Sequence, residues 1–376
     1  MEELIILGNG FDISCGLKSR YSDFYNYRYT PSFLEKIEDF YIKDSESDTD
    51  INFWDVVLAS PHIEDVRNAD WKDIESLLTK YLLIVNNYGH YLYSVITYYN
   101  NRLVKNFPEH ASIDDETHYT IVALARISHK KFKKNFGFET GTTDQRQTFF
   151  SSVLMEELRK YELCFQQYLA NEIEQNSEYS HSCEDKLNEL IKADKTKFEA
   201  ASIYLDIKVL TFNYTTPFSV SAPSTTKINR IKNVHGSINK KNIVFGIDEF
   251  SEASEDFVKF TKTYRALSMT KNHSEKLYSK NLQTIKFFGH SLGEADYSYF
   301  QSIFDGIDLY GSDVKLIFYY SRFHEHENDN NNEDELQYQR ITKLLKRYGE
   351  TRENIFHGKN LMHKLILEGR ISIVDL

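Results

Sequence analysis

Four short motifs in this 376-residue chain combine glycine with side chains that bind or transfer protons. They are G-N-G-F-D at 8–12, T-F-N-Y-T at 211–215, H-G-S at 235–237 and F-G-H-S-L-G at 288–293. Glycine has no Cβ, so its backbone can approach a phosphate closely. Histidine and aspartate can exchange a proton with a water or hydroxyl, and an asparagine amide can orient one. The motifs therefore predict a phosphate-containing ligand with proton-transfer groups near it.

The first motif predicts the phosphate loop. Gly8 and Gly10 fit this use, but the third glycine of an ordinary dinucleotide-binding loop would stand at Ile13. A nicotinamide-dependent dehydrogenase is therefore poorly supported, and a tight strand-to-helix turn without a ligand is the alternative. Asp12 is either an acceptor for ribose hydroxyls or water, or a cap that bonds a backbone N–H of the following turn.

The other motifs supply candidate catalytic groups. Asn213 would orient a ribose hydroxyl or a water, although an asparagine here is also typical of a turn. His235 would take a proton from one of them as a neutral imidazole, unless it is structural. His290 is either a second acid–base group or a hydrogen-bond donor to a phosphate. Gly289 would admit a phosphate or ribose, and Ser291 would hydrogen-bond it.

The elements that position these motifs are short, continuous apolar runs, which are typical of strands buried on both faces. The runs lie at residues 4–7, 207–212, 231–234, 243–245, 285–288, 316–320 and 371–374. Each motif follows or ends such a run. Ligands bind beyond the carboxyl ends of parallel strands, so the motifs should converge there. We expect an α/β fold with a Rossmann-like, parallel-rich sheet of six or seven strands and the first strand central.

A mostly helical segment separates the first strand from the rest. Its clearest helix has apolar residues three and four apart, at Phe150, Leu154, Leu158, Tyr161, Phe165 and Tyr168. We therefore predict a nucleotide-binding α/β domain at 1–30 and 201–376, interrupted by a helical insertion at 31–200. The acidic, asparagine-rich stretch at 325–335 is predicted to be a surface loop.

Composition narrows the class of protein. The net charge of −11 disfavours a nucleic-acid binder, because phosphate backbones are bound by Lys and Arg. Three cysteines without C-x-x-C spacing predict neither a disulfide framework nor a zinc site. No apolar stretch is long enough for a membrane span, and the N-terminus lacks the basic region of a signal peptide. We expect a cytoplasmic protein that does not contact a membrane.

The motifs carry a family resemblance. The segment G-N-G-F-D-I-S-C-G-L-K-S-R-Y-S-D-F resembles the N-terminal motif of the bacterial abortive-infection AbiH family. T-F-N-Y-T and F-G-H-S-L-x-x-x-D, which ends at Asp296, are also similar to that family, and the similarity runs from residue 1 to about 300. The motif order is similar to that of sirtuins as well. Asp12 stands where sirtuins have serine, and Thr215 stands where they have aspartate.

The resemblance implies a phage-defence protein on a sirtuin-like nucleotide-binding fold. It implies hydrolysis of the N-glycosidic bond of NAD to nicotinamide and ADP-ribose, with no metal required. The catalytic groups would be His235 as base, Asn213 holding the water, and Asp12. The implied ligand contacts are Gly8, Asn9, Gly10, Phe11, Asp12, Tyr21, Phe24, Thr211, Asn213, Gly289, His290, Ser291 and Asp296.

Two alternatives belong to other functional classes. One is an enzyme that acts on another nucleotide or on nucleic acid. The other is a non-catalytic sensor of a nucleotide or ADP-ribose that signals through the helical insertion to a defence partner protein or a second copy of the chain. Nicotinamide release separates hydrolysis from sensing, because a sensor binds the ligand without turnover.

Overall fold

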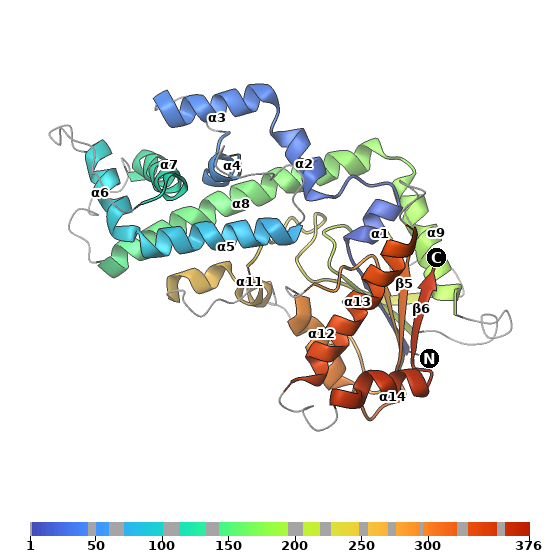
Figure 1. Ribbon diagram of the computed structural model, residues 1–376. Coiled ribbons are helices and arrows are strands. Elements are labelled where there is room, and N and C mark those ends of the chain that lie inside the picture. The colour runs from blue at the N-terminus through green and yellow to red at the C-terminus, as the bar shows by residue number, and fades with distance from the viewer. Residues whose placement is uncertain are drawn as a thin grey trace. The chain divides into compact units, whose positions relative to one another are not determined.

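The computed structural model describes residues 2–43, 50–59, 71–100, 113–132, 143–194, 206–218, 227–247, 255–269, 276–293, 296–321, 330–351 and 358–376. The chain forms two compact units (Figure 1). The sheet unit comprises Met1–Ser19, Asn171–Asn242 and Asn272–Leu376. The helical unit comprises Arg20–Ala170 and Ile243–Lys271.

The sheet unit is built on six strands, all paired in parallel. They are β1 Glu2–Leu7, β2 Asp206–Thr211, β3 Lys227–Asn233, β4 Leu282–Phe288, β5 Lys315–Tyr320 and β6 Ile371–Asp375. Their order is β3-β2-β1-β4-β5-β6, which is the strand order of the Rossmann fold. The predicted α/β class and the interior position of the first strand are confirmed. The strand order reverses between β1 and β4, where open α/β sheets bind their ligands.

One predicted strand is absent. Residues 243–245 belong to the helical unit and have no ladder partner. Charged side chains take the backbone bonds of Phe245 instead: its N–H donates to Glu162 Oε1 at 2.7 Å, and its carbonyl accepts from the Arg265 guanidinium at 2.7 Å. The apolar run is buried, but the backbone of Phe245 bonds to side chains and not to a neighbouring strand.

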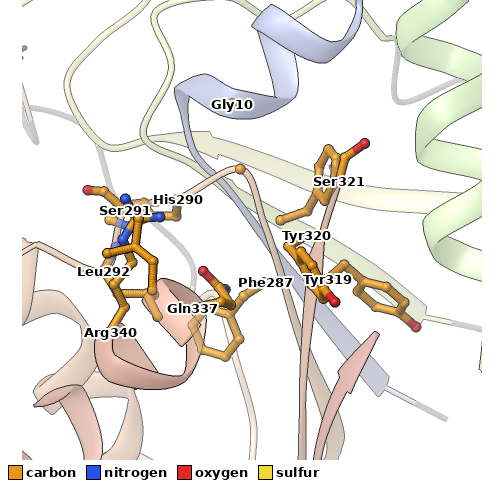
Figure 2. Close-up of a pocket in the computed structure, with 13 residues that line it drawn as sticks. Gly10, Phe287, His290, Ser291, Leu292, Tyr319, Tyr320, Ser321, Gln337 and Arg340 are labelled. Carbon is orange, nitrogen blue, oxygen red and sulfur yellow. The ribbon is translucent and has the colours of Figure 1, made fainter. Parts of the chain in front are cut away.

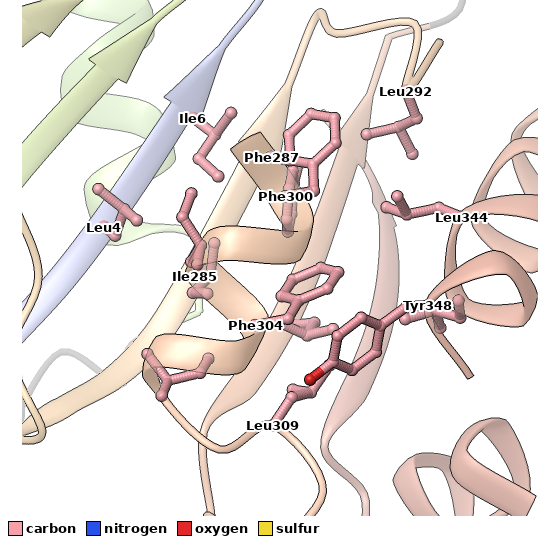
Figure 3. Packing of buried hydrophobic residues seen from close by; sticks show 14 of the residues in the cluster. Leu4, Ile6, Ile285, Phe287, Leu292, Phe300, Phe304, Leu309, Leu344 and Tyr348 are labelled. Atoms are coloured by element: carbon pink, nitrogen blue, oxygen red, sulfur yellow. The ribbon is translucent and has the colours of Figure 1, made fainter. Parts of the chain in front are cut away.

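Helices cover both faces of the sheet. On one face Leu4 and Ile6 of β1 belong to a buried cluster with Phe300 and Phe304, which lie on α12 (Tyr297–Gly306) (Figure 3). The cluster continues into α13 (Asn330–Gly349) and α14 (Leu361–Leu367). Because α13 begins at Asn330, residues 330–335 form the first turns of a helix, and the prediction of a loop there is wrong. Residues 322–329 lie outside the described residues.

Helix α9 (Tyr179–Lys192) packs on the other face, where a buried lysine side chain of the sheet binds it. The side chain of Lys286 on β4 is fully buried, and its Nζ donates to the carbonyls of Leu190 and Ile191 at 2.9 and 3.2 Å. These carbonyls belong to the last turn of α9, and the carbonyls of a last turn have no hydrogen-bond partner within their own helix. Lys286 also pairs with Glu3 and Asp194. Helix α9 lies within the predicted insertion by sequence, but it groups with the sheet.

The helical unit contains the long helix α8 (Thr143–Gln175), whose residues up to 170 belong to it. All six residues of its predicted apolar face are buried, which confirms that helix. The other helices are α2 Tyr21–Arg28, α3 Pro31–Lys43, α4 Phe53–Leu58, α5 Trp71–Asn87, α6 Gly89–Asn100, α7 Asp115–Phe132, η3 Glu255–Phe260 and α11 Lys262–Ser268. Among the described residues, no helix is both long and apolar enough to cross a membrane.

Candidate functional site

The loops after β1 and β4 pack backbone against backbone. The N–H of Gly8 donates to the carbonyl of Phe288 at 3.0 Å, and that of Gly10 donates to the carbonyl of Gly289 at 2.8 Å. A Cβ on Gly10 would lie 2.7 Å from Gly289 Cα. Gly289 has φ +70°, and a Cβ there would lie 2.2 Å from the backbone nitrogen of Phe11. The glycines of the first and fourth motifs are thus needed for the two loops to meet, whether or not a phosphate binds.

Asn9 and Phe11 hold the first loop in place. The Asn9 side chain accepts a 2.6 Å bond from the Ser19 hydroxyl and donates to the Ser19 carbonyl. Phe11 is buried edge-to-face against Phe288, the last residue of β4, and against Phe218. Both residues belong to α1 (Asn9–Ser14), so the short helix is anchored at the switch point of the sheet.

Asp12 is buried among hydrogen-bond donors. The Thr215 hydroxyl donates to its Oδ2 at 2.7 Å, and the Tyr179 hydroxyl of α9 donates to its Oδ1 at 3.0 Å. Burial raises the pKa of the Asp12 carboxyl to about 6, and the bonds from Thr215, Tyr179 and Asn213 offset part of that rise. Asp12 therefore joins three parts of the sheet unit. It bonds side chains, and does not cap a backbone N–H as the alternative supposed.

Asn213 is oriented by its neighbours. Its backbone N–H donates to Thr211 Oγ1 at 3.1 Å, and its backbone carbonyl accepts from the Asn233 amide at 3.0 Å. Its side chain bonds Asp12, while its Oδ1 atom is buried and has no hydrogen-bond partner among the described residues. An unsatisfied buried acceptor is costly. The geometry therefore leaves one fixed acceptor beyond the end of β2.

Two histidines face one carboxylate beyond the ends of β3 and β4. His235 Nε2 lies 3.5 Å from Asp296 Oδ1, and His290 Nε2 lies 3.4 Å from Asp296 Oδ2. The N–H of Leu292 donates to His290 Nδ1 at 2.9 Å, so the Nε2 of that ring carries the proton. The Phe212 ring contacts both imidazoles, with centroids 4.4 Å from His290 and 5.7 Å from His235. The third and fourth motifs therefore meet in a single His–Asp–His cluster.

A cavity of about 240 Å³ opens beside this cluster, at the ends of β4 and β5 (Figure 2). Of the predicted ligand contacts it is lined by Gly10, Gly289, His290 and Ser291. Sequence reasoning missed the opposite wall, which comes from residues 319–321 and from Gln337 and Arg340 of α13. These residues carry no motif, and α13 begins inside a stretch that was predicted to be loop.

Tyr21 and Phe24 lie in the helical unit, on α2. Both are buried in an aromatic cluster: the Tyr21 hydroxyl is 2.8 Å from that of Tyr161, and the Phe24 ring packs edge-to-face against Phe165 of α8. Their role as ligand contacts stays a prediction. Within the described ranges no three His, Cys, Asp or Glu side chains are grouped as metal ligands.

Comparisons with known proteins place the chain in one family. The family model described as "Bacteriophage abortive infection AbiH" matches residues 4–320. Searches of curated proteins and of solved structures found no match. The matched span includes all four motifs, the His–Asp–His cluster, most of β1 and the whole of β2 to β5. Because the match covers most of the chain, this protein belongs to the bacteriophage abortive infection AbiH family, which indicates a role in abortive-infection defence against bacteriophage.

Proposed function

We propose that the protein contributes to defence by hydrolysing the N-glycosidic bond of NAD to nicotinamide and ADP-ribose. The observation that carries this proposal is the His235–Asp296–His290 cluster. It lies at the carboxyl ends of a sheet in Rossmann order, beside a cavity that residues of the first and fourth motifs line. Depletion of a shared cofactor would stop an infected cell, in keeping with abortive infection.

The reaction requires modest chemistry from the protein. The bond between ribose C1′ and the pyridinium nitrogen breaks, and its electron pair leaves with nicotinamide, which becomes neutral. A water oxygen bonds to C1′ and loses a proton to a base. The transition state has oxocarbenium character, as in other glycoside cleavage. The site must therefore hold the ligand, place one water and accept one proton.

His235 is the proposed base. A carboxylate that faces Nε2 favours the tautomer with its proton there and leaves Nδ1 unprotonated. Asp296 faces Nε2 of His235 at 3.5 Å, longer than an ordinary hydrogen bond, and catalytic bonds are often long before substrate binds. The Oδ1 acceptor of Asn213 would receive a hydrogen bond from the water or from a ribose hydroxyl. Asp12 would act through Asn213 by holding its amide.

The order of the motifs, which resembles that of sirtuins, supports the proposal of an NAD ligand. Two positions depart from the sirtuin pattern. Asp12 stands where sirtuins have a serine, and Thr215 stands where they have an aspartate. The carboxylate and the hydroxyl have thus exchanged positions. In this chain they bond to each other at 2.7 Å. In this chain the two positions therefore hold one carboxylate and one hydroxyl side by side.

The direct test is nicotinamide release from NAD by the full-length chain. We expect turnover by the parent, and a loss of about a hundredfold or more in His235→Ala, the usual scale of general acid–base catalysis. His181→Ala is the matched control, because His181 is an exposed histidine on α9 that pairs only at the surface, with Asp185. It should keep the parent rate. Melting temperature and ADP-ribose affinity, measured on the same preparations, separate lost chemistry from lost folding.

Different outcomes would overturn different parts of this proposal. A folded His235→Ala protein with parental turnover would remove His235 as the base. A parent that binds ADP-ribose but releases no nicotinamide would favour the nucleotide sensor, and release of product from a different nucleotide would favour another hydrolase.

A further inference from the structure

The cavity beside the His–Asp–His cluster has two walls of different origin. One wall comes from the loops after β1 and β4, which lie within the span matched by the family model. The other includes Gln337 and Arg340, and these residues of α13 lie beyond residue 320, the last residue matched. The cavity is therefore lined in part by residues outside the matched span.

The described residues that line the cavity differ in charge from the chain as a whole. Acidic residues outnumber basic ones in the chain, 56 to 45, yet among the described lining residues there is an arginine and no acidic residue. Arg340 lines it and is half-buried, and among the described residues its guanidinium makes no hydrogen bond or ion pair. A guanidinium beside a cavity whose described lining has no carboxylate is suited to bind an anion from outside the chain.

The size and place of the cavity indicate which part of a ligand it would take. At about 240 Å³ it is below the usual size of a pocket that encloses a whole drug-sized ligand. Gly10 and Gly289 line it, at the crossing between β1 and β4. In sheets of this order, the diphosphate of a dinucleotide crosses the sheet at that point. Ser291 and Gln337 add uncharged hydrogen-bond donors (Figure 2).

We propose that Arg340 of α13 is the counter-charge for the diphosphate of the nucleotide, with Ser291 and Gln337 as neutral donors in the same subsite. This inference rests on the proposed function for the identity of the nucleotide. A planar guanidinium can bond two phosphate oxygens at once, which a lysine ammonium cannot do with the same geometry. Arg340 is thus a binding residue, and the reacting C1′ atom is left to the His–Asp–His cluster.

The experiment is calorimetric titration of the full-length chain with ADP-ribose, inorganic pyrophosphate and nicotinamide riboside, which has no phosphate. Arg340→Gln should bind ADP-ribose and pyrophosphate about ten- to a hundredfold more weakly, the scale of a hydrogen bond to a charged group. The affinity of Arg340→Lys for these two ligands should lie between that of the parent and that of Arg340→Gln. Nicotinamide riboside should bind parent and variants alike. Lys346→Gln, an exposed residue on the same helix, removes the same charge and should leave every affinity unchanged.

The outcomes distinguish this subsite from the hydrolytic proposal. Arg340-dependent ADP-ribose binding without NAD turnover would keep the subsite and reject hydrolysis. NAD turnover with the same KM in parent and Arg340→Gln would keep hydrolysis and reject the subsite. Equal ADP-ribose affinity in the two proteins, an equal loss in Lys346→Gln, or no binding of ADP-ribose and pyrophosphate by the parent would each overturn the assignment of Arg340.

Discussion

At the scale of single residues, two aspartates of the sheet unit have different surroundings. Asp296 lies partly exposed, with one carboxylate oxygen 3.5 Å from His235 Nε2 and the other 3.4 Å from His290 Nε2. Asp12 is 2% exposed and accepts from two hydroxyl groups and an amide. The first arrangement places one carboxylate between two groups that can carry a proton. The second suits a group that holds other side chains in position.

The raised pKa of Asp12 makes stability depend on pH. Because its pKa rises from 3.8 to about 6 on folding, its contribution to stability is complete below about pH 4 and is lost as pH rises through 6. The parent should lose about 3 kcal/mol at most over this window, because a difference of one in pKa corresponds to roughly 1.4 kcal/mol. Asp12→Asn should not show that loss. Urea unfolding at several pH values between 4 and 7.5 measures the difference.

Asp185→Asn is the control for this prediction, because Asp185 is exposed on α9. Its unfolding free energy should follow the parent across the same pH range. If the unfolding free energies of Asp12→Asn and of the parent change in parallel with pH, burial does not raise the pKa of the Asp12 carboxyl as proposed.

At the scale of elements, the contact between the loops after β1 and β4 depends on glycines, which have no side chain. Gly289 combines a positive φ with close approach, since a Cβ added to it would lie only 2.2 Å from a neighbouring backbone atom. Gly369 also has a positive φ, of +63°, but a Cβ there would meet nothing within 4 Å. The two glycines therefore separate the cost of the backbone conformation from the cost of close approach.

We expect Gly369→Ala to lower the free energy of unfolding by about 1–2 kcal/mol, the strain of a left-handed residue with a Cβ. Gly289→Ala should cost distinctly more, since the loops must also move apart. It should weaken ADP-ribose binding as well, if the loops form the subsite. Chemical unfolding of the two variants tests the first expectation. Equal losses would show that the loops separate without cost.

At the scale of the whole molecule, the fold extends past the residues matched by the family model. Strand β6 pairs with β5, and α13 and α14 bury Ile341, Leu344 and Leu365 in the core of the sheet unit. Each such side chain contributes roughly 1.5–3 kcal/mol on burial, and the net stability of a domain is only about 5–15 kcal/mol.

A chain that ends at residue 320 should therefore lose cooperative folding of the sheet unit, although it contains all four motifs. Circular dichroism during thermal unfolding, compared with the full-length chain, measures this. A truncated chain with a sharp transition at the parental temperature would show that the C-terminal elements are dispensable for folding. It would also allow a direct measurement of nucleotide binding without Arg340.

Local patterns in the sequence predicted the class of fold and the edge of the sheet at which the motifs gather. Apolar runs such as residues 4–7 must be buried on both faces, and spacings of three and four residues identify the buried face of α8. These signals are local, and local periodicity therefore sufficed. It failed at residues 243–245, where side chains and not a strand bond the backbone.

Which side chains contact one another depends on the three-dimensional packing of the chain. Asp12 and Thr215 are 203 residues apart, and no pattern in the chain shows that they bond. The same holds for Asp296, which the motif places after β4 but which the fold sets between two histidines. Arg340 has no motif and is brought to the cavity by the packing of α13 on the sheet. Such contacts depend on how distant elements pack, and residue spacing along the chain carries no record of that packing.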